Sequence, residues 1–459
     1  MVATCTFIGV FGLISSLSSA YTIPAGLLRN SSNHSGPCET DISHLWGQYS
    51  PFFSVPSEIS AEVPPQCTIT FAQVLSRHGA RDPTASKTAA YNKTIAKIQA
   101  GSKNLTGKYA FISDYRYTLG ADQLTTFGQQ ELVDSGADFY TRYSELARDS
   151  TPFVRSSGEA RVVESAQNWT QGFTHAKIGD DGTKDYPKID VVIPEADGLN
   201  NTLNHGLCTS FEAGHDSGIA SDAQKQFANV FVPPLQARLS ATLGVNLTQT
   251  EAIYVMDLCP FNTVASPNGE ISAFCDLFTT EEWRSYDYYL SLNKFYGYGS
   301  GNPLGPTQGV GFSNELIARM TGKPVVDHTS TNSSLDGSGT SFPLGRPLYA
   351  DFSHDSDMTS IFFALGLYND TAPLSNTTVE PTTQTNGYSS AWTVPFAARA
   401  YFEKMQCVGH EERVRVIIND RVLPLRSCGS DAFGTCTLSS FVDSLTFVEN
   451  GGNWNQCLA

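Results

Sequence analysis

The chain has 459 residues, of which 40% are hydrophobic, so it is long enough to bury a large core and is not an intrinsically disordered protein. Its 29 Lys and Arg face 45 Asp and Glu, which gives a formal net charge of −16 at pH 7. This acidic balance argues against a nucleic-acid-binding protein, whose surface is basic. The length favours two or three domain-sized units.

Residues 1–20 are predicted to be a secretory signal peptide. An apolar stretch from Thr6 to Leu17 is too short to cross a bilayer and is followed by small residues. No basic residue precedes the stretch, which leaves a buried N-terminal helix as the alternative. Secretion also fits the Asn-X-Ser/Thr sequons at Asn30, Asn33, Asn92, Asn104, Asn168, Asn200, Asn246, Asn332, Asn369 and Asn376.

The 10 cysteines are scattered and lack the CxxC pairs of a zinc site. Their wide spacing favours disulfides formed in an oxidising compartment. If Cys5 leaves with the signal peptide, an odd number remains, so one thiol lacks an intramolecular partner.

Residues 21–66 are rich in Ser and Pro and are predicted to be an extended arm. Strands and helices then alternate, which favours an α/β core with a parallel or mixed sheet. The predicted strands are Cys67–Leu75, Thr151–Arg155 and Ile189–Pro194, and the predicted helices are Thr88–Ala100, Thr126–Ala147 and Ala160–Phe173. The second of these helices is expected to begin with Thr126 as its cap, ahead of Gln129.

Residues 197–290 differ, because helical periods at Gln224–Leu243 and Thr280–Leu292 dominate there. We therefore expect an α/β domain made of residues 67–196 and 291–459, with residues 197–290 as a helical cap. The α/β pattern returns in the second part with Pro347–Phe352, Thr359–Leu367, Val414–Asn419 and Arg421–Pro424, and residues 328–345 and 371–390 are predicted loops.

Charged side chains stand where the predicted strands end. The first strand leads into RHGAR at 77–81, the second ends in Arg155, and LYADFS at 348–353 is followed by His354 and Asp355. In an open α/β sheet, ligands bind beyond the carboxyl ends of the strands. These side chains are therefore predicted to form one site.

Such a set suits a phosphoryl group. Arginine presents a planar fork of donors to phosphate oxygens, and Gly79 would allow close approach of the backbone. A histidine kept neutral among arginines can attack phosphorus, and Asp355 is the available proton donor for a leaving alcohol. Each residue alone is better explained as a surface ion pair or a helix cap. The combination is what indicates a phosphatase, and no phosphate-binding GxxxxGK[ST] loop or metal motif is present.

A basic cluster begins at the same place. Between residues 77 and 108, Asp82 is the only acidic residue, against Arg77, Arg81, Lys87, Lys93, Lys97, Lys103 and Lys108. A basic segment in an acidic protein, starting at a phosphate site, predicts a substrate with more than one phosphate. The alternative is a solvated helix face, since Lys93 and Lys97 are four residues apart.

RHGARDP at 77–83 together with His354-Asp355 resembles the motif pair of the histidine acid phosphatases. Within that family the chain is most similar to the secreted fungal phytases of the 3-phytase type. The similarity extends through SHLWGQYSPFF (43–53), TFAQVLSRHGAR (70–81), GNPLGPTQGVGFSNELIAR (301–319), LYADFSHD (348–355) and SSAWTVPFAAR (389–399). It covers nearly the whole mature chain.

The resemblance implies a phosphoglycerate-mutase-like α/β domain with a smaller all-α domain inserted, and a two-step hydrolysis without cofactor or metal. His78 would form a phosphohistidine and Asp355 would protonate the leaving group. Phosphoryl oxygens would be held by Arg77, Arg81, Arg155 and His354, and outer phosphates of phytate (inositol hexakisphosphate) by Lys87 and Lys108.

The resemblance also implies disulfides, and it leaves Cys38 without a partner. The implied pairs are Cys67–Cys407, Cys208–Cys457, Cys259–Cys275 and Cys428–Cys436. We expect a secreted monomer that acts on a small polyanion, with neither a nucleic acid nor a membrane as partner.

The sequence departs from the family pattern at Asp82, Ser356 and Ser113. An aromatic residue, an Asn and, in some relatives, a Lys are usual at these positions. The departures favour the alternative of a broad-specificity acid phosphatase. A glycoprotein that binds inositol phosphates without catalysis is a further alternative, although a mere binder has no use for a proton donor.

Overall fold

The computed structural model describes residues 41–182 and 186–458, and residues 42–459 form one compact unit. The predicted signal peptide, most of the predicted arm and Cys38 lie outside the described residues. The last part of the arm, from Asp41 onward, is described and includes the short 3-10 helices Ile42–Leu45 and Gly47–Tyr49.

A mixed sheet in the order β3-β2-β4-β1-β5-β6-β7, with β8 beside β6, is the centre of the fold. Strands β3, β2, β4 and β1 are parallel to one another, whereas β5 to β8 pair antiparallel. The prediction of a parallel or mixed sheet is confirmed in its mixed form. The strands are β1 Cys67–Arg77, β2 Phe153–Ser157, β3 Ile189–Ile193, β4 Leu348–Ser353, β5 Arg399–Cys407, β6 Arg413–Ile418, β7 Arg421–Leu423 and β8 Cys436–Thr437.

The longer helices agree with most of the predicted ones and add several. They are α1 Ala85–Gly101, α2 Thr126–Arg142, α4 Ala160–Asp181, α6 Ile219–Leu243, α7 Gln249–Ala265, α8 Thr280–Tyr298, α9 Val310–Thr321 and α11 Asp355–Ala364. The shorter ones are α3 Ser144–Ala147, α5 Thr209–Ala213, α10 Ser333–Asp336, α12 Ser390–Thr393, α13 Leu438–Ser444 and α14 Thr446–Glu449. Helix α2 is capped by Thr125 rather than Thr126, because the Thr125 side chain accepts the N–H of Gly128.

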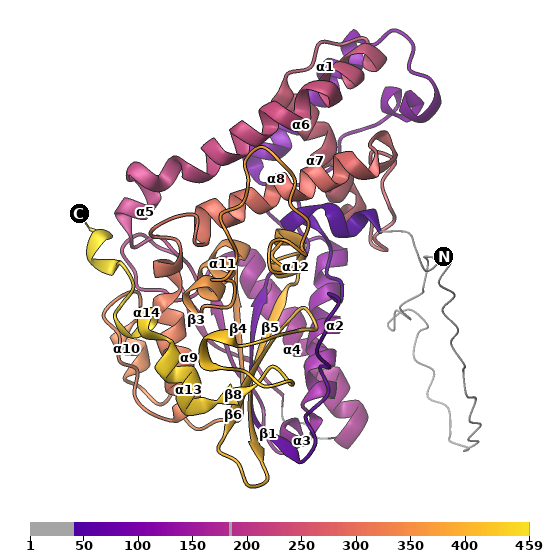
Figure 1. Cartoon of the computed structure of the whole chain (residues 1–459). Helices are drawn as coiled ribbons and strands as arrows, with labels where there is room; N and C mark the ends of the chain where they lie inside the picture. The colour runs from indigo at the N-terminus through magenta and orange to yellow at the C-terminus, as the bar shows by residue number, and fades with distance from the viewer. Residues whose placement is uncertain (1–40, 183–185, 459) are drawn as a thin grey trace, which may run out of the picture. The chain divides into compact units, whose positions relative to one another are not determined.

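Strand β1 is buried on both faces, as its run of apolar and β-branched residues predicts. Ala72 and Val74 belong to one core cluster, with residues of α2 and α4. Phe71 and Leu75 belong to another, with residues of α9 and α11. Helices therefore cover the sheet on both sides (Figure 1).

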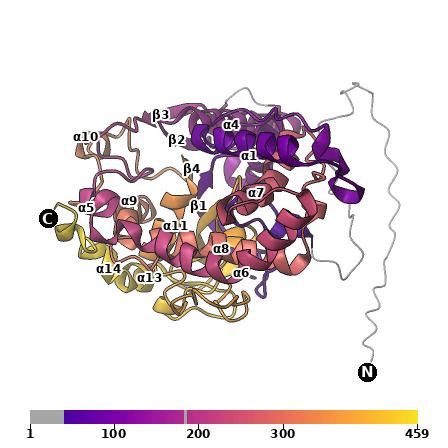
Figure 2. The same cartoon turned by 90° about the horizontal axis from the view of Figure 1, so that it is seen from above.

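Helices α1, α6, α7 and α8 lie together on the side of the sheet where α11 begins (Figure 1), and α6 and α8 run side by side in the view from above (Figure 2). Their apolar residues share one cluster. Thr248 and Thr279 start α7 and α8 with capping boxes, in which each Thr exchanges hydrogen bonds with a Glu three residues on. The cap predicted at 197–290 omits α1, which belongs to the same cluster. The domain boundaries stay a prediction.

Four disulfides are present in the described part of the chain, and they are the four pairs that the resemblance implies: Cys67–Cys407, Cys208–Cys457, Cys259–Cys275 and Cys428–Cys436. The first joins the start of β1 to the end of β5. In the part of the chain described, no helix has the length and apolar character that crossing a membrane requires.

A buried charge network lies within and beside the sheet. Arg155 of β2 and Asp351 of β4 are cross-strand neighbours, and Arg155 Nε lies 2.8 Å from Asp351 Oδ1. Arg155 also reaches Glu315 Oε2 at 2.6 Å, and Arg319 reaches Asp351 Oδ2 at 2.6 Å. A third acid, Asp336, joins this group and raises the number of carboxyl groups above that of the arginines.

Burial, and then the charge of Glu315, raise the pKa of Asp336 to about 7. Its oxygens are buried and accept no hydrogen bond from the described residues, so a protonated Asp336 that donates to Glu315 fits this environment best. Because the pKa is raised in the folded state, this carboxyl favours folding at low pH. Its contribution is lost as the pH rises from about 4 to 7.

We expect Asp336→Asn to remove part of this pH dependence, because an amide donates to Glu315 at any pH. At pH 7.5 the variant should be more stable than the wild type by roughly 1 kcal/mol, the carboxyl being only partly buried, and at pH 4 nearly equal. Thermal unfolding at both pH values measures this, with the exposed Asp149→Asn as control. Identical pH profiles for wild type and Asp336→Asn would contradict it.

Candidate active site

The two predicted motifs meet because β1 and β4 are parallel and in register up to their ends. Arg77 pairs with Ser353, and the His78 N–H donates to Ser353 O at 3.2 Å. The chain therefore leaves both strands at the same edge of the sheet. The rings of His78 and His354 lie there with their centroids 5.7 Å apart.

The loop after β1 is held from several sides. Gly79 N–H donates to Ser165 Oγ at 3.1 Å, and Ala80 N–H donates to Glu131 Oε2 at 2.9 Å. A Cβ on Gly79 would lie 2.2 Å from the carbonyl oxygen of Gly128 in α2. The glycine thus serves close packing against α2, rather than the approach of the backbone to a ligand that the sequence suggested.

His78 is arranged as a neutral nucleophile. Its Nδ1 lies 2.8 Å from the carbonyl oxygen of Gly79, which can only accept, so Nδ1 carries the proton and Nε2 keeps its lone pair. Burial, and then the positive charges of Arg77 and Arg161, hold the pKa of His78 well below its ordinary value. The imidazole is therefore neutral at mildly acidic pH.

Three guanidinium groups carry positive charges that act on this histidine and lower its pKa. They belong to Arg77, Arg81 and Arg161. The Nε atom of each is buried and has no hydrogen-bond partner among the described residues. Buried donors without a partner are costly unless an acceptor satisfies them. Phosphate oxygens are acceptors of the charge and geometry that such donors match.

Arg155, which the sequence assigned to this group, is not brought to it. Strand β2 continues to Ser157, so Arg155 lies in its middle, 1% exposed, and its guanidinium is engaged by Asp351 and Glu315. Arg161, in the first turn of α4, supplies the third guanidinium instead. In the sequence it looks like an ordinary helix-surface charge. One signal was available: Arg161 comes shortly after a predicted strand, at the start of a helix whose N-terminus can bind an anion.

Asp355 is ionised in the ligand-free protein. Its Oδ2 lies 2.8 Å from Arg77 NH2, and its Oδ1 lies 3.1 Å from Lys294 Nζ. Burial would raise the pKa of Asp355, but Arg77 and Lys294 outweigh burial and hold it well below its ordinary value. Lys294, near the C-terminal end of α8 and far in sequence from either motif, was missed by sequence reasoning. Burial lowers its own pKa.

His354 is flanked by two acids. Its Nε2 donates to Glu195 Oε1 at 3.0 Å and lies 3.6 Å from Glu159 Oε2. Burial would raise the pKa of Glu195, but the hydrogen bond from His354 and its charge lower it to about 2. Ligand atoms of the three residues lie within 4.8 Å of one another, a composition that could hold a metal ion. Both carboxylates already have partners, because Glu195 contacts His354 and Glu159 contacts Arg161 and His354.

The predicted lysines differ in their placement. Lys87 Nζ lies 4.0 Å from Asp257 Oδ2 and 4.7 Å above the Tyr254 ring. Burial, and then the charge of Asp257, raise the pKa of the neighbouring Tyr49, and the positive charge of Lys87 opposes them. Lys108 instead donates to the carbonyl oxygen of Asp276 at 2.7 Å, and its contacts lie within the helical cluster.

Two of the unusual residues contact the site. The backbone oxygen of Asp82 accepts from Arg81 NH1 at 2.8 Å. The Asp82 side chain accepts the N–H of Gly120 at 3.0 Å, and its pKa is raised, mainly by burial. Ser356 Oγ accepts from Lys294 Nζ at 3.0 Å. Ser113 is exposed at the end of a 3-10 helix.

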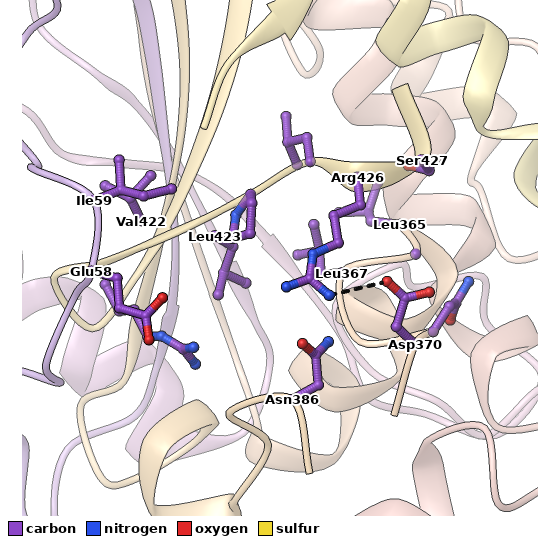
Figure 3. A pocket seen from close by; sticks show the side chains of 15 residues that line it. Glu58, Ile59, Leu365, Leu367, Asp370, Asn386, Val422, Leu423, Arg426 and Ser427 are labelled. Carbon is purple, nitrogen blue, oxygen red and sulfur yellow. Dashed lines mark hydrogen bonds and ion pairs between the residues drawn. The ribbon is translucent and has the colours of Figure 1, made fainter. Parts of the chain in front are cut away.

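The pocket in Figure 3, with a volume of about 240 Å³, lies beside β7 and is lined by other residues. Its charged groups engage each other, as Arg426 and Asp370 do at 3.5 Å. Asn369, a sequon asparagine, also lines it. None of the predicted catalytic residues lines this pocket.

Known proteins resemble this chain along almost its whole length. Residues 68–419 match the model of the histidine phosphatase superfamily (branch 2). Phytase A of Aspergillus oryzae is 52% identical over 458 residues, covering 98% of each chain, and phytase A of Aspergillus awamori is 52% identical, covering 97% of this chain and 98% of the relative.

Solved structures share the fold. The phytase of D. castellii superposes with a TM-score of 0.73 at 24% identity, covering 91% of this chain and 88% of that one. Multiple inositol polyphosphate phosphatase of Bifidobacterium longum gives a TM-score of 0.64 at 15% identity, covering 88% and 97%.

The chain therefore belongs to branch 2 of the histidine phosphatase superfamily and is a histidine acid phosphatase. Within that family, the relatives with which it shares about half of its residues are the fungal enzymes named phytase A.

Variants of two arginines should separate their roles. Arg161→Ala is expected to weaken binding of inorganic phosphate about 10-fold or more and leave folding intact. Arg155→Ala should lower the free energy of unfolding by about 3–5 kcal/mol, because it leaves Asp351 and Glu315 with an uncompensated buried charge. Calorimetric titration and thermal unfolding measure the two effects, with the exposed Arg148→Ala as control. Loss of phosphate binding in a stably folded Arg155→Ala would contradict the assignment.

Proposed function

We propose that the protein is a secreted acid phosphomonoesterase that hydrolyses phytate to lower inositol phosphates and inorganic phosphate through a phosphohistidine at His78. The observation that carries this proposal is the neutral His78, with its Nε2 lone pair among three guanidinium groups and with Asp355 beside them. Its relatives named phytase A agree with it.

In the first step, Nε2 of His78 attacks phosphorus and the bond from phosphorus to the ester oxygen breaks. Arg77, Arg81, Arg161 and His354 hold the phosphoryl oxygens, where added negative charge is stabilised. Asp355 gives its proton to the departing alcohol. In the second step, water attacks phosphorus, Asp355 takes up a proton from it, and the bond from phosphorus to nitrogen breaks.

Asp355 must be protonated for the first step although it is ionised in the ligand-free protein. A bound phosphoryl group carries negative charge and shares Arg77 and Lys294 with the carboxylate. Both effects raise the pKa of Asp355 in the complex. Acid pH then supplies the proton, which is why we assign activity to the mildly acidic range.

A polyphosphate substrate is favoured by a cation beyond the reacting phosphate. Lys87 extends over Tyr254 from the first turn of α1, whereas Lys294 lies beside Asp355 at the reacting phosphate. We assign an outer phosphate to Lys87 rather than to Lys108. The Bifidobacterium longum phosphatase that shares the fold is known in complex with inositol hexasulfate.

Secretion and a monomeric state complete the proposal. The four disulfides are suited to an oxidising compartment. The sequons at Asn30 to Asn376 are the acceptors of glycans in such a compartment.

The reaction is tested by phosphate release from phytate and from an aryl phosphate at about pH 5 with a chelator present. Wild type should prefer phytate and lose no activity to the chelator, and His78→Ala should lose at least about a thousandfold in rate. His175→Ala, which changes an exposed histidine of α4, is the control. Equal rates on both substrates would favour the broad-specificity phosphatase, and the absence of hydrolysis of either would leave only a binding protein.

The role of Lys294 gives a pH-dependent prediction. Lys294→Met removes a cation that stabilises ionised Asp355, so the pKa of Asp355 rises and the group stays protonated to higher pH. The alkaline limb of the kcat profile should therefore move up by about 1 pH unit. A kcat profile from pH 3 to 8 measures this, with the exposed Lys225→Met as control. A shift to lower pH would contradict Asp355 as the proton donor.

A further inference from the structure

The side chain of Glu159 lies at the candidate site, although its position before α4 would suit a helix cap. It is the residue before the first turn of α4, where a side chain often accepts helix N–H groups, yet its side chain makes no capping hydrogen bond. Its carboxylate reaches across to Arg161 NH1 with one oxygen and lies 3.6 Å from His354 Nε2 with the other. Arg161 and His354 are two of the groups that the proposed function assigns to phosphoryl oxygens.

We propose that Glu159 is an internal competitor for phosphate, whose carboxylate takes the places of phosphoryl oxygens in the ligand-free site. The inference rests on the proposed function for the identity of the ligand. A carboxylate and one edge of a phosphate present the same pair of oxygens to a guanidinium fork. Both cannot occupy Arg161 and His354 at once.

The surroundings of Glu159 suit a group that moves aside. Its side chain is 35% exposed, whereas those of Arg161 and His354 are 12% and 11% exposed. The charged groups around it are Arg161 on its own helix, His354 before α11, and Glu195 after β3, with Arg81 beside Arg161. Glu195 accepts from Ser157 Oγ and Glu159 N–H at 2.6 and 3.1 Å, and so holds His354 while the Glu159 side chain swings.

Competition of this kind favours product release. Inorganic phosphate would otherwise leave a site with several buried guanidinium groups slowly. When Glu159 recaptures Arg161, it provides the guanidinium with a partner as phosphate departs. The competitor acts only when it is charged, because a protonated carboxyl group competes poorly for a guanidinium.

Glu159→Gln tests the inference, because the amide keeps the shape of the side chain and removes the charge. At pH 5.5 the variant should bind inorganic phosphate about 5- to 10-fold more tightly than wild type, in calorimetric titration and as an inhibitor of hydrolysis. Glu164→Gln, which removes the same charge further along α4, should change phosphate binding by less than about twofold.

The inference is overturned if Glu159→Gln binds phosphate no more tightly than wild type at pH 5.5. It is also overturned if Glu164→Gln shows the same gain. The titration needs no turnover, so it decides the inference even if phytate hydrolysis fails, and failure of hydrolysis alone counts against the proposed function instead.

Discussion

The site depends on the parallel pairing of β1 with β4. Register is specified strongly here, because both strands are buried on both faces and a slip by one residue would turn every side chain to the opposite face. That register brings the ends of β1 and β4 to one level, so that His78 and His354 follow at the same edge. Two residues nearly 280 positions apart thus become neighbours through strand pairing alone, and no long loop is needed to bring them together.

The electrostatics of the site follow from an excess of buried cations. Burial, and then the charges of Arg77, Arg161 and Arg81, lower the pKa of His78, and Arg77 with Lys294 keeps Asp355 ionised. In the ligand-free protein, Asp355 and Glu159 provide part of the missing negative charge. In the proposed mechanism, a phosphoryl group that enters the site takes over cations from both carboxylates. Asp355 can then accept a proton and Glu159 is displaced, so that binding would prepare the protonation of the leaving group.

The sequence predicted the elements whose patterns are local. Strand β1, strand β4 and the motifs that follow them were recognisable because apolar runs end on unusual polar residues. Strand β5 was not predicted, because Glu403 and Arg399 interrupt its apolar pattern. Both are buried in the structure, Glu403 with Arg415 and Arg142, and Arg399 against Phe52. Only tertiary contacts reveal that these charges belong inside.

The part of the candidate site that lies in the two short motifs was predictable from the sequence. The residues that other segments contribute were not. Arg155 was assigned to the site because the second predicted strand was expected to end at this residue. Strand β2 continues for two more residues, and the Arg155 guanidinium lies in the buried charge network with Asp351. Arg161 and Lys294 lie within helices, where their local patterns resemble those of surface charges, and only the place of Arg161 at the start of α4 hints at more. The contacts that define them, with the groups around His78 and Asp355, come from other elements.

The position of β1 in the sheet has a consequence for biosynthesis. Its neighbours are β4, which begins at Leu348, and β5, which ends at Cys407, and Cys67 is bonded to Cys407 over a sequence separation of 340. A nascent chain therefore holds β1, with its apolar faces uncovered, until most of the protein has emerged. Long-range pairing of this kind slows folding and exposes strands to aggregation. Oxidation of Cys67 with its native partner is thus one of the last covalent steps open to the chain, because Cys407 emerges after Cys208, Cys259 and Cys275.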